Sequence, residues 1–189
     1  MNIVEEVKKE IINRSNLFEE QTKGTKDEYN IYNEHIKYVY NYVILLSKDK
    51  DVDKEVLEIS ALLHDIAMTD INLDRSKHNE YGSIIAEDIL TKLNYPKDKI
   101  EMVKKCILNH SNKRKEYRTT LEEQILVDAD NLSHFDSIKN LYSLAYNVIG
   151  LNKEESIKYV QDKLTRDYNE LSDNLKPLVE DKYNRIMNN

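Results

Sequence analysis

Hydrophobic side chains recur at helical spacing along most of the chain, and polar stretches separate the segments that carry them. The pattern predicts helices over residues 2–20, 32–47, 54 to about 68, about 79–93, a stretch opening near 96, and 120–132. From Phe135 onward it predicts two or three further amphipathic helices, the last interrupted at Pro177. We therefore expect an all-α fold.

Capping signals support these boundaries. Asp51 or Asp53 can cap the third helix, and Pro96 can open the fifth. Thr120 and Glu123 have the spacing of a capping box at the start of the sixth. The stretches TDINLDRSK and SNKRKEYR are polar and predict loops.

Composition favours the same class. Only 3 Gly and 2 Pro leave few tight turns for a many-stranded β architecture, while 40% hydrophobic residues suffice for a core. No repeat or Gly/Ser-rich linker divides the chain, so we expect a single domain over residues 1–189. Cys106 is the single cysteine, which excludes an internal disulfide and a Cys-rich zinc site; we expect it to be a buried hydrophobe.

Charge and hydropathy limit the partners. The net charge of -7 disfavours binding of a nucleic-acid duplex, which requires a basic surface. The chain has neither a signal peptide nor an apolar stretch long enough for a membrane span, so we expect a cytoplasmic protein without membrane contact. A small phosphorylated ligand stays compatible, because a bound metal can reverse the field inside one cleft.

Several histidines and carboxylates fall on apolar helix faces. His35 precedes Val39 and Val43 by one and two turns, and His110 follows Ile107 by three residues. Taken singly, an inward histidine is more often a satisfied core residue than a ligand. Inward side chains from separate helices need a common partner, and a divalent cation meets that need. The remaining members of the set are His64, Asp65 and Asp130.

The ordered set resembles the HD superfamily of metal-dependent phosphohydrolases, which is named for the doublet found here in ALLHDIA. The resemblance covers about residues 28–150, and helices over about 151–189 would be additions to this core. Its other segments are NEHIKYVYNYV with His35, HNEYGSIIAEDIL with His78, VKKCILNHS with His110 and ILVDADNLSHFD with Asp130.

Carried over by position, the resemblance implies two metal ions. The first would bind His35, His64, Asp65 and Asp130, and the second would bind His78 and His110, with Asp65 as the bridge. The metal would be Fe, Mn, Co, Ni or Zn, since imidazole and carboxylate ligands serve all of these. His134 matches no ligand position, and we expect it beside the ligands or at the surface.

The implied reaction is hydrolysis of a phosphoester or phosphoanhydride by metal-activated water, with Asp65 and His64 as catalytic residues. The implied substrate is a nucleoside monophosphate or triphosphate, or a dinucleoside polyphosphate. Asp70, Asp74 and Asp128 are acid or base candidates by proximity in sequence alone.

Basic residues near the ligands predict phosphate contacts. Arg75 and Lys77 precede His78, and Lys113 and Arg114 follow His110; these four are the substrate-binding candidates. We expect the next two bases, Lys115 and Arg118, on the solvated surface.

Two alternatives stay open. Some HD-type di-iron proteins resemble oxygenases, and a non-catalytic, metal-stabilised module could bind a nucleotide or a protein. The C-terminal helices could form a homodimer interface.

Overall fold

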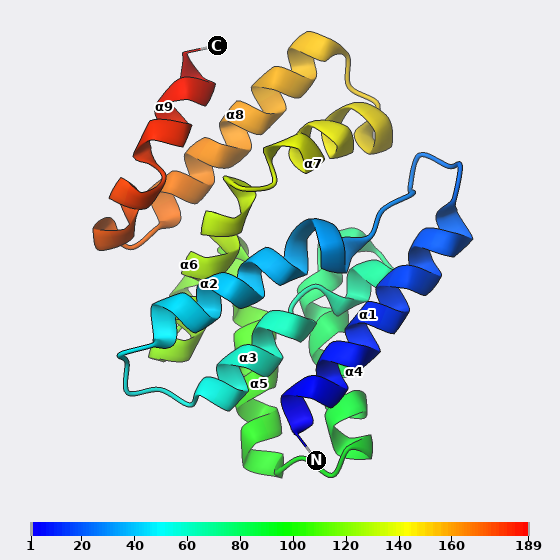
Figure 1. Ribbon diagram of the computed structural model, residues 1–189, viewed down its shortest axis with the longest axis vertical. Helices are drawn as coiled ribbons and strands as arrows, with labels where there is room; N and C mark the ends of the chain where they lie inside the picture. The colour runs from blue at the N-terminus through cyan, green and yellow to red at the C-terminus, as the bar shows by residue number, and fades with distance from the viewer. Residues whose placement is uncertain (1, 189) are drawn as a thin grey trace.

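Helices build the whole architecture of the computed structural model, which describes residues 2–188, and no strand occurs within that range (Figure 1). The all-α prediction is confirmed. None of the helices in the described range combines the length and apolarity that crossing a membrane requires.

The elements follow one another with short connections. The α-helices are α1 Ile3–Thr22, α2 Lys37–Ser47, α3 Lys54–Leu63, α4 His78–Lys92, α5 Lys97–Asn109, α6 Leu121–His134, α7 Ile138–Ser143, α8 Lys153–Glu170 and α9 Glu180–Met187. Two π-helical turns are η1 Tyr32–Ile36 and η5 Leu144–Ile149. The 3₁₀ turns are η2 Ile66–Thr69, η3 Arg75–Lys77, η4 Asn112–Tyr117 and η6 Asp173–Leu178.

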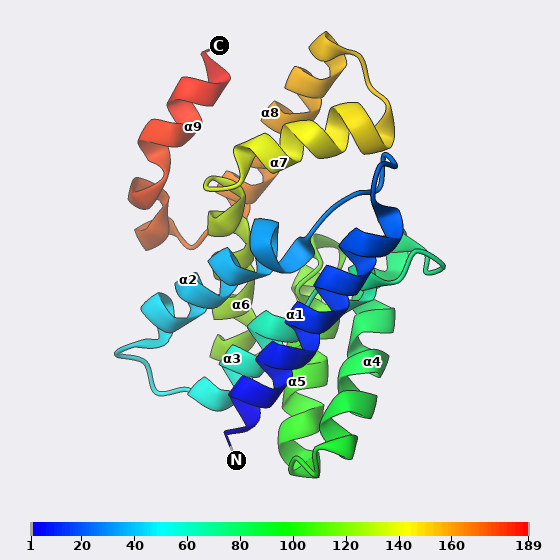
Figure 2. The same ribbon diagram turned by 45° about the vertical axis from the view of Figure 1, so that its right-hand side comes forward.

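The helices form two layers. In the first, α4 packs along α5, α2 along α6, and α1 against α3, which lies centrally (Figure 1). In the second, α7, α8 and α9 lie at the end of the molecule that is remote from the N-terminus, in both views (Figure 2). The second layer has its own apolar cluster, in which Phe135 and Leu132 of the α6 end meet Val160, Leu164 and Leu171. Helix α6 therefore joins the layers.

Capping side chains set several boundaries as predicted. Asp53 accepts a hydrogen bond from the Val56 amide at 3.1 Å and starts α3. Thr120 and Glu123 form a reciprocal capping box at the start of α6. Pro96 directly precedes α5. The caps at Asp53 and Thr120 satisfy amides that the first turn of a helix leaves without partners.

The third helix is shorter than predicted. Helix α3 ends at Leu63, and the chain continues as the separate turn η2 instead of running on to Met68. Asp65 has φ -112° and ψ 20°, outside the helical range, which breaks the ladder directly after His64. The HD doublet therefore lies at a helix end, where two adjacent side chains can face one point.

Candidate metal centre

The six ligands expected from sequence converge on one point of the first layer. His35 comes from η1, His64 and Asp65 follow α3, His78 opens α4, His110 follows α5, and Asp130 lies in α6. Five of the six lie at or near a helix boundary, where the backbone can turn a side chain along the helix axis. The fold thus brings together residues separated by up to ninety-five positions.

One set of ligand atoms surrounds a single point. His35 Nε2 lies 3.1 Å from His64 Nε2 and 3.2 Å from Asp130 Oδ1. Asp65 Oδ2 lies 3.6 Å from His35 Nε2 and 3.7 Å from His64 Nε2. Ligands bound at about 2.0–2.2 Å to one ion are roughly 3–3.6 Å from each other. These four side chains could therefore hold one cation with small adjustments.

A second set lies on the other side of Asp65. His78 Nε2 and His110 Nε2 are 3.1 Å apart, and they lie 3.5 and 3.7 Å from Asp65 Oδ1. The two carboxylate oxygens of Asp65 are thus divided between the two sets. This is the arrangement that a bridging carboxylate requires.

Backbone carbonyls orient three of the rings. Nδ1 of His64 lies 2.9 Å from the Ala61 carbonyl, and Nδ1 of His110 lies 2.6 Å from the Ile107 carbonyl. Nδ1 of His78 makes the same contact, at 2.9 Å, with the carbonyl three residues before it. A carbonyl only accepts, so each Nδ1 carries the hydrogen and each Nε2 offers its lone pair to the centre. The last carbonyls of a helix lack amide partners, and this is why helix ends provide these acceptors.

His35 is oriented by a side chain instead. The Ser133 hydroxyl donates to the Asp130 carbonyl at 2.7 Å, so its oxygen accepts from His35 Nδ1 at 3.3 Å. Ser133 is one α-helical turn from Asp130 and is itself fully buried. The same helix α6 therefore supplies one ligand and holds another.

Burial and carboxylates set the protonation of the rings. Burial lowers the pKa of His64 to about 4, which keeps this ring neutral. Burial also opposes the charged form of His35, but the hydrogen bond and charge of Asp130 outweigh it and raise the pKa. The pKa of His110 is raised in the same way by Asp65. Metal binding at His35 and His110 would therefore compete with protons and depend on pH.

The donor set fits a divalent metal. Asp65 Oδ1 is buried and has no hydrogen-bond partner, which is a costly state for a carboxylate oxygen. Burial would raise the pKa of Asp65, yet the surrounding histidines, His64 first, hold it below its usual range, so the oxygen is anionic. A cation between this oxygen and the two rings facing it would satisfy it. Four imidazoles and two carboxylates suit Fe, Mn, Co, Ni or Zn.

Close packing fixes the doublet from behind. Gly82 of α4 lies against the backbone of His64, and a Cβ at Gly82 would be 3.2 Å from the His64 carbonyl oxygen and 3.3 Å from Ile107 Cγ2. A methyl group at this position would make the His64 carbonyl or the Ile107 side chain give by a few tenths of an ångström. The two ligand-bearing helix ends therefore rest directly against α4.

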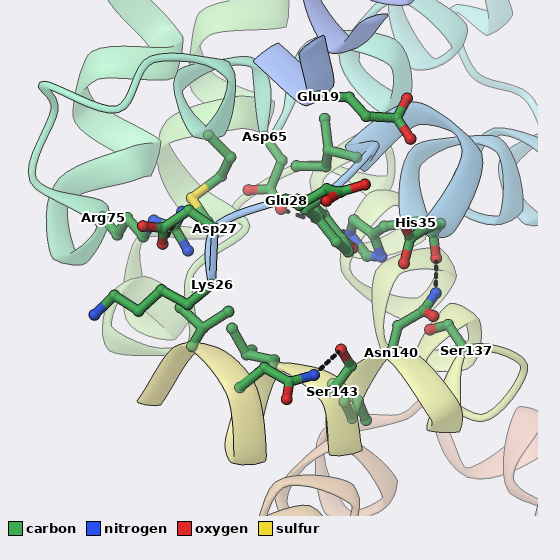
Figure 3. Close-up of a pocket in the computed structure, with 18 of the residues that line it drawn as sticks. Glu19, Lys26, Asp27, Glu28, His35, Asp65, Arg75, Ser137, Asn140 and Ser143 are labelled. Atoms are coloured by element: carbon green, nitrogen blue, oxygen red, sulfur yellow. Dashed lines mark hydrogen bonds and ion pairs between the residues drawn. The ribbon is translucent and has the colours of Figure 1, made fainter. Parts of the chain in front are cut away.

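A cavity of about 590 Å³ opens beside the ligands, with His35 and Asp65 in its wall. Its entrance loop, between α1 and η1, contributes Lys26 and Asp27, which Figure 3 shows next to Arg75. Ser137 and Asn140 lie on the opposite side (Figure 3). The candidate ligands are thus bordered by a cavity with room for a small molecule.

Comparison with known families agrees with this geometry. Residues 32–134, just over half of the chain, match the family model of the HD domain. The chain belongs to the HD domain family. The matched segment holds every one of the six candidate ligands.

A solved structure resembles the chain beyond that segment. It is the crystal structure, at 1.45 Å resolution, of a predicted HD superfamily hydrolase from an uncultured Thermotogales bacterium, with 22% sequence identity and a TM-score of 0.54. The alignment covers 83% of this chain and 84% of that chain. At this identity the likeness shows the shared fold. No curated protein matches the chain. Together with the ligand set, membership of the HD family places the chain in a superfamily of metal-dependent hydrolases.

The expected phosphate-binding bases lie in different places within the HD domain. Arg75 lines the cavity, with Nη2 3.5 Å from Asp27 Oδ1. The described lining residues do not include Lys77, Lys113 or Arg114. Arg114 donates to Asn109 Oδ1 at 2.9 Å, because η4 folds back onto the end of α5.

One surface expectation is wrong. Arg118 has a side chain only 5% exposed, and it donates to the carbonyls of Asn109, His110 and Ser111. It therefore caps the end of α5 and holds the backbone of a candidate ligand. Lys115 is exposed as expected.

The three acid or base candidates point elsewhere. Both carboxylate oxygens of Asp128 accept from Ser172, at 2.9 Å from its amide and 2.6 Å from its hydroxyl. Asp70 and Asp74 cap exposed turns. None of the three is among the described residues that line the cavity.

Residues outside the matched HD segment complete the cavity, and most of them belong to no motif or spacing that marks a site. Lys26 and Tyr29 come from the entrance loop, and Lys163 comes from α8. Buried Asp167 accepts from Lys163 at 2.7 Å and lies 3.1 Å from His134 Nδ1.

His134 stacks on His35, with ring centroids 5.2 Å apart, which places it beside the ligands. Asp167 follows Leu164 by three residues on the apolar stripe of α8, and this spacing predicts an inward carboxylate, as it does for the histidines.

Proposed function

We propose that this HD protein is a metal-dependent phosphohydrolase that cleaves a phosphoester or phosphoanhydride of a nucleotide or related small molecule. The observation that carries the proposal is the division of Asp65: one oxygen faces His35 and His64, and the other faces His78 and His110. Two ions bound in this way would lower the pKa of a water molecule and neutralise charge on a phosphoryl group.

The chain's own residues would hold the reacting group in place. His64 and Asp65 fix the ligand geometry through the rigid end of α3, and the cavity beside them admits the substrate. Arg75 lies in the wall and can exchange its long contact with Asp27 for a phosphoryl oxygen. Polarised donors aimed at developing negative charge are the usual source of rate enhancement in such sites.

The partner is a phosphorylated small molecule and not a nucleic-acid duplex. The cavity has the size of a small ligand, and besides Asp65 four carboxylates contribute to its wall, namely Glu19, Asp27, Glu28 and Glu34. A polyanionic duplex would be repelled by the net charge of -7. The homodimer interface on the C-terminal helices stays a prediction.

A loading and turnover experiment tests the proposal. The protein is stripped with a chelator and reloaded separately with Mn, Fe, Co, Ni or Zn, and bound metal is measured by elemental analysis. We expect two equivalents per chain and phosphate release from at least one member of a panel of nucleotides. Asp70→Asn is the control variant, because this carboxylate is exposed and lies near the doublet in sequence. We expect it to bind the same amount of metal and to release phosphate as the wild type does.

Two results would count against hydrolysis. Two bound equivalents with no phosphate released from any panel member would overturn the proposal. Oxygen consumption by the reduced, iron-loaded protein in place of hydrolysis would favour the oxygenase alternative.

A further inference from the structure

The cavity extends well past the metal ligands. Its far wall comes from the second layer, with Leu141 of α7, Leu144 and Val148 of η5, and Tyr159 of α8. All four follow residue 134, the end of the matched HD segment. A volume of about 590 Å³ lies in the range of roughly 300–1,000 Å³ that sites for organic ligands occupy. A phosphate group alone does not need this wall.

The far wall combines apolar surface with uncharged hydrogen-bonding groups. Ser143 lies on the cavity wall (Figure 3). Its hydroxyl oxygen accepts from Asn147 Nδ2 at 3.0 Å, and both residues are exposed to the cavity side. The amide oxygen of Asn147 remains available to a ligand. Apolar walls with a few placed polar groups are typical of sites that bind a ring system.

Two π-helical turns contribute to the same cavity. Turn η1 carries His35 and Glu34, and turn η5 carries Leu144, Asn147 and Val148. Such turns are rare and occur often at functional sites. The first is explained by its metal ligand. The second has no metal ligand, so its place in the cavity wall points to substrate contact.

The charges of the wall restrict the number of phosphate groups. Glu19, Asp27, Glu28 and Glu34 line the side that includes the entrance loop and η1. The described wall also holds three basic side chains: Lys26, Arg75, which is near Asp27, and Lys163, which is bonded to buried Asp167. The carboxylates therefore outnumber them. A second or third phosphate group would lie against carboxylates, which is unfavourable at short distance.

We propose that the substrate is a phosphomonoester of an uncharged, ring-bearing alcohol of about nucleoside size, and that α7, η5 and α8 bind this alcohol. The inference rests on the proposed phosphohydrolase function and specifies its substrate class. The phosphoryl group would lie at the metal ligands, and the ring would lie against Leu144 and Val148, within reach of Asn147. Hydrolysis then gives inorganic phosphate and the free alcohol, with water as the only co-reactant.

Matched substrates provide the first test. The metal-loaded protein is assayed with a nucleoside monophosphate, the di- and triphosphate of the same nucleoside, and ethyl phosphate. We expect kcat/KM for the monophosphate to exceed that for each of the other three at least about tenfold. Equal or faster turnover of the triphosphate, or of ethyl phosphate, would overturn the inference and leave the proposed function standing. Absence of turnover with all four would count against the proposed function itself.

A matched pair of variants tests the far wall. Val148→Phe fills the cavity, and Ile149→Phe adds the same ring on the same turn at an exposed residue that does not line it. For the monophosphate, we expect Val148→Phe to raise KM at least about tenfold, with little change for ethyl phosphate, and Ile149→Phe to change neither. Asn147→Ala alters an exposed side chain without filling the core and should raise KM for the monophosphate in the same direction.

Binding without turnover gives an independent readout. Calorimetric titration of the metal-free protein with the free nucleoside should show binding that Val148→Phe weakens and Ile149→Phe does not. Unchanged nucleoside affinity in both Val148→Phe and Asn147→Ala, with melting temperatures equal to that of the wild type, would overturn the assignment of the far wall.

Discussion

The two sides of the cavity are built in different ways. On the metal side, five of the six candidate ligands come from short segments at or near helix boundaries, and each ring has its orientation fixed by a nearby hydrogen bond. On the far side, α7, η5 and α8 present ordinary apolar and amide side chains with no recognisable spacing. The difference indicates that the ligand set follows a local pattern, whereas the far wall of the cavity depends on how a second layer packs.

Polar contacts and apolar packing both join the two sides. Asp167 of α8 contacts His134, and Asp128 of α6 accepts from Ser172. Asn140 of α7 donates to the Glu34 carbonyl at 2.8 Å, and Arg118 pairs with Glu170 of α8. Leu132 and Phe135 pack against α8. Variants at these contacts should therefore lower the stability of the second layer while leaving the bound metal content unchanged.

The largest effect is expected from Asp65→Ala. Because both oxygen atoms of Asp65 face ligand sets, the variant should lose both metal equivalents and at least about a thousandfold in kcat/KM. His110→Ala should lose one equivalent and retain the other, since it removes a ring from one set alone. Elemental analysis and steady-state kinetics measure both. Retention of two equivalents by Asp65→Ala would contradict the bridging arrangement.

Asp167→Asn should destabilise the protein by about 2–3 kcal/mol at pH 7. Its carboxylate is fully buried between His134 and Lys163, and Lys163 reaches solvent, which reduces the cost below that of a wholly buried pair. The variant should keep both metal equivalents, because Asp167 is outside the ligand set. Asp162→Asn, exposed on the same helix, is the control.

The effect of Asp167→Asn should depend on pH. Burial would raise the pKa of Asp167, but His134 and Lys163 outweigh it and lower the pKa. The stability that the carboxylate contributes is therefore complete above the ordinary pKa of about 4 and is lost as pH falls through the lower folded value. Urea titrations of the metal-free proteins should show the gap between wild type and variant narrowing below about pH 4. A gap that widens on acidification would contradict this account.

Gly82→Ala should weaken metal binding about tenfold with only a small change in stability. A methyl group at this position would press on the His64 carbonyl and displace the doublet, at a cost of about 1–2 kcal/mol. Alanine is the better helix former by about 1 kcal/mol, which offsets most of that cost. Competitive metal titration measures the affinity. Unchanged affinity would show that α4 can yield without moving the ligands.

The smallest effect is expected from Ser172→Ala. The variant loses a hydroxyl that donates to Asp128 at 2.6 Å, while the amide contact at 2.9 Å remains. We expect a loss of about 1 kcal/mol in the free energy of unfolding and no change in metal content. Asn174→Ala, exposed in the same turn, is the control. A change in metal content would show that the two sides are coupled more tightly than their contacts suggest.

Much of the first layer was predictable from periodicity and caps. The capping box of Thr120 and Glu123 and the cap at Asp53 are local hydrogen bonds, so short sequence patterns suffice to find them. The end of α3 was misplaced because the apolar pattern continues through Ile66 and Met68, while the break depends on the backbone at Asp65. Hydrophobic spacing carries no information about such a break.

The residues that line the cavity were predicted less well than the helices, for a physical reason. Arg75, Lys77, Lys113 and Arg114 were chosen because they adjoin ligands in sequence, but adjacency does not determine on which side of a turn a long side chain lies. Only Arg75 of the four is in the described cavity wall. Contributors from α7, η5 and α8 depend on long-range packing, which no local pattern records.

The ring-to-carbonyl contacts of His64, His78 and His110 each span four residues of chain. The orientation of each ring therefore depends only on its own four-residue segment. The centre is formed by several such segments and not by one extended hydrogen-bond network. Substitutions in the connecting segments can shift the position of a histidine-bearing segment without rotating its ring. The connecting segments are thus free to diversify around a constant set of ligands.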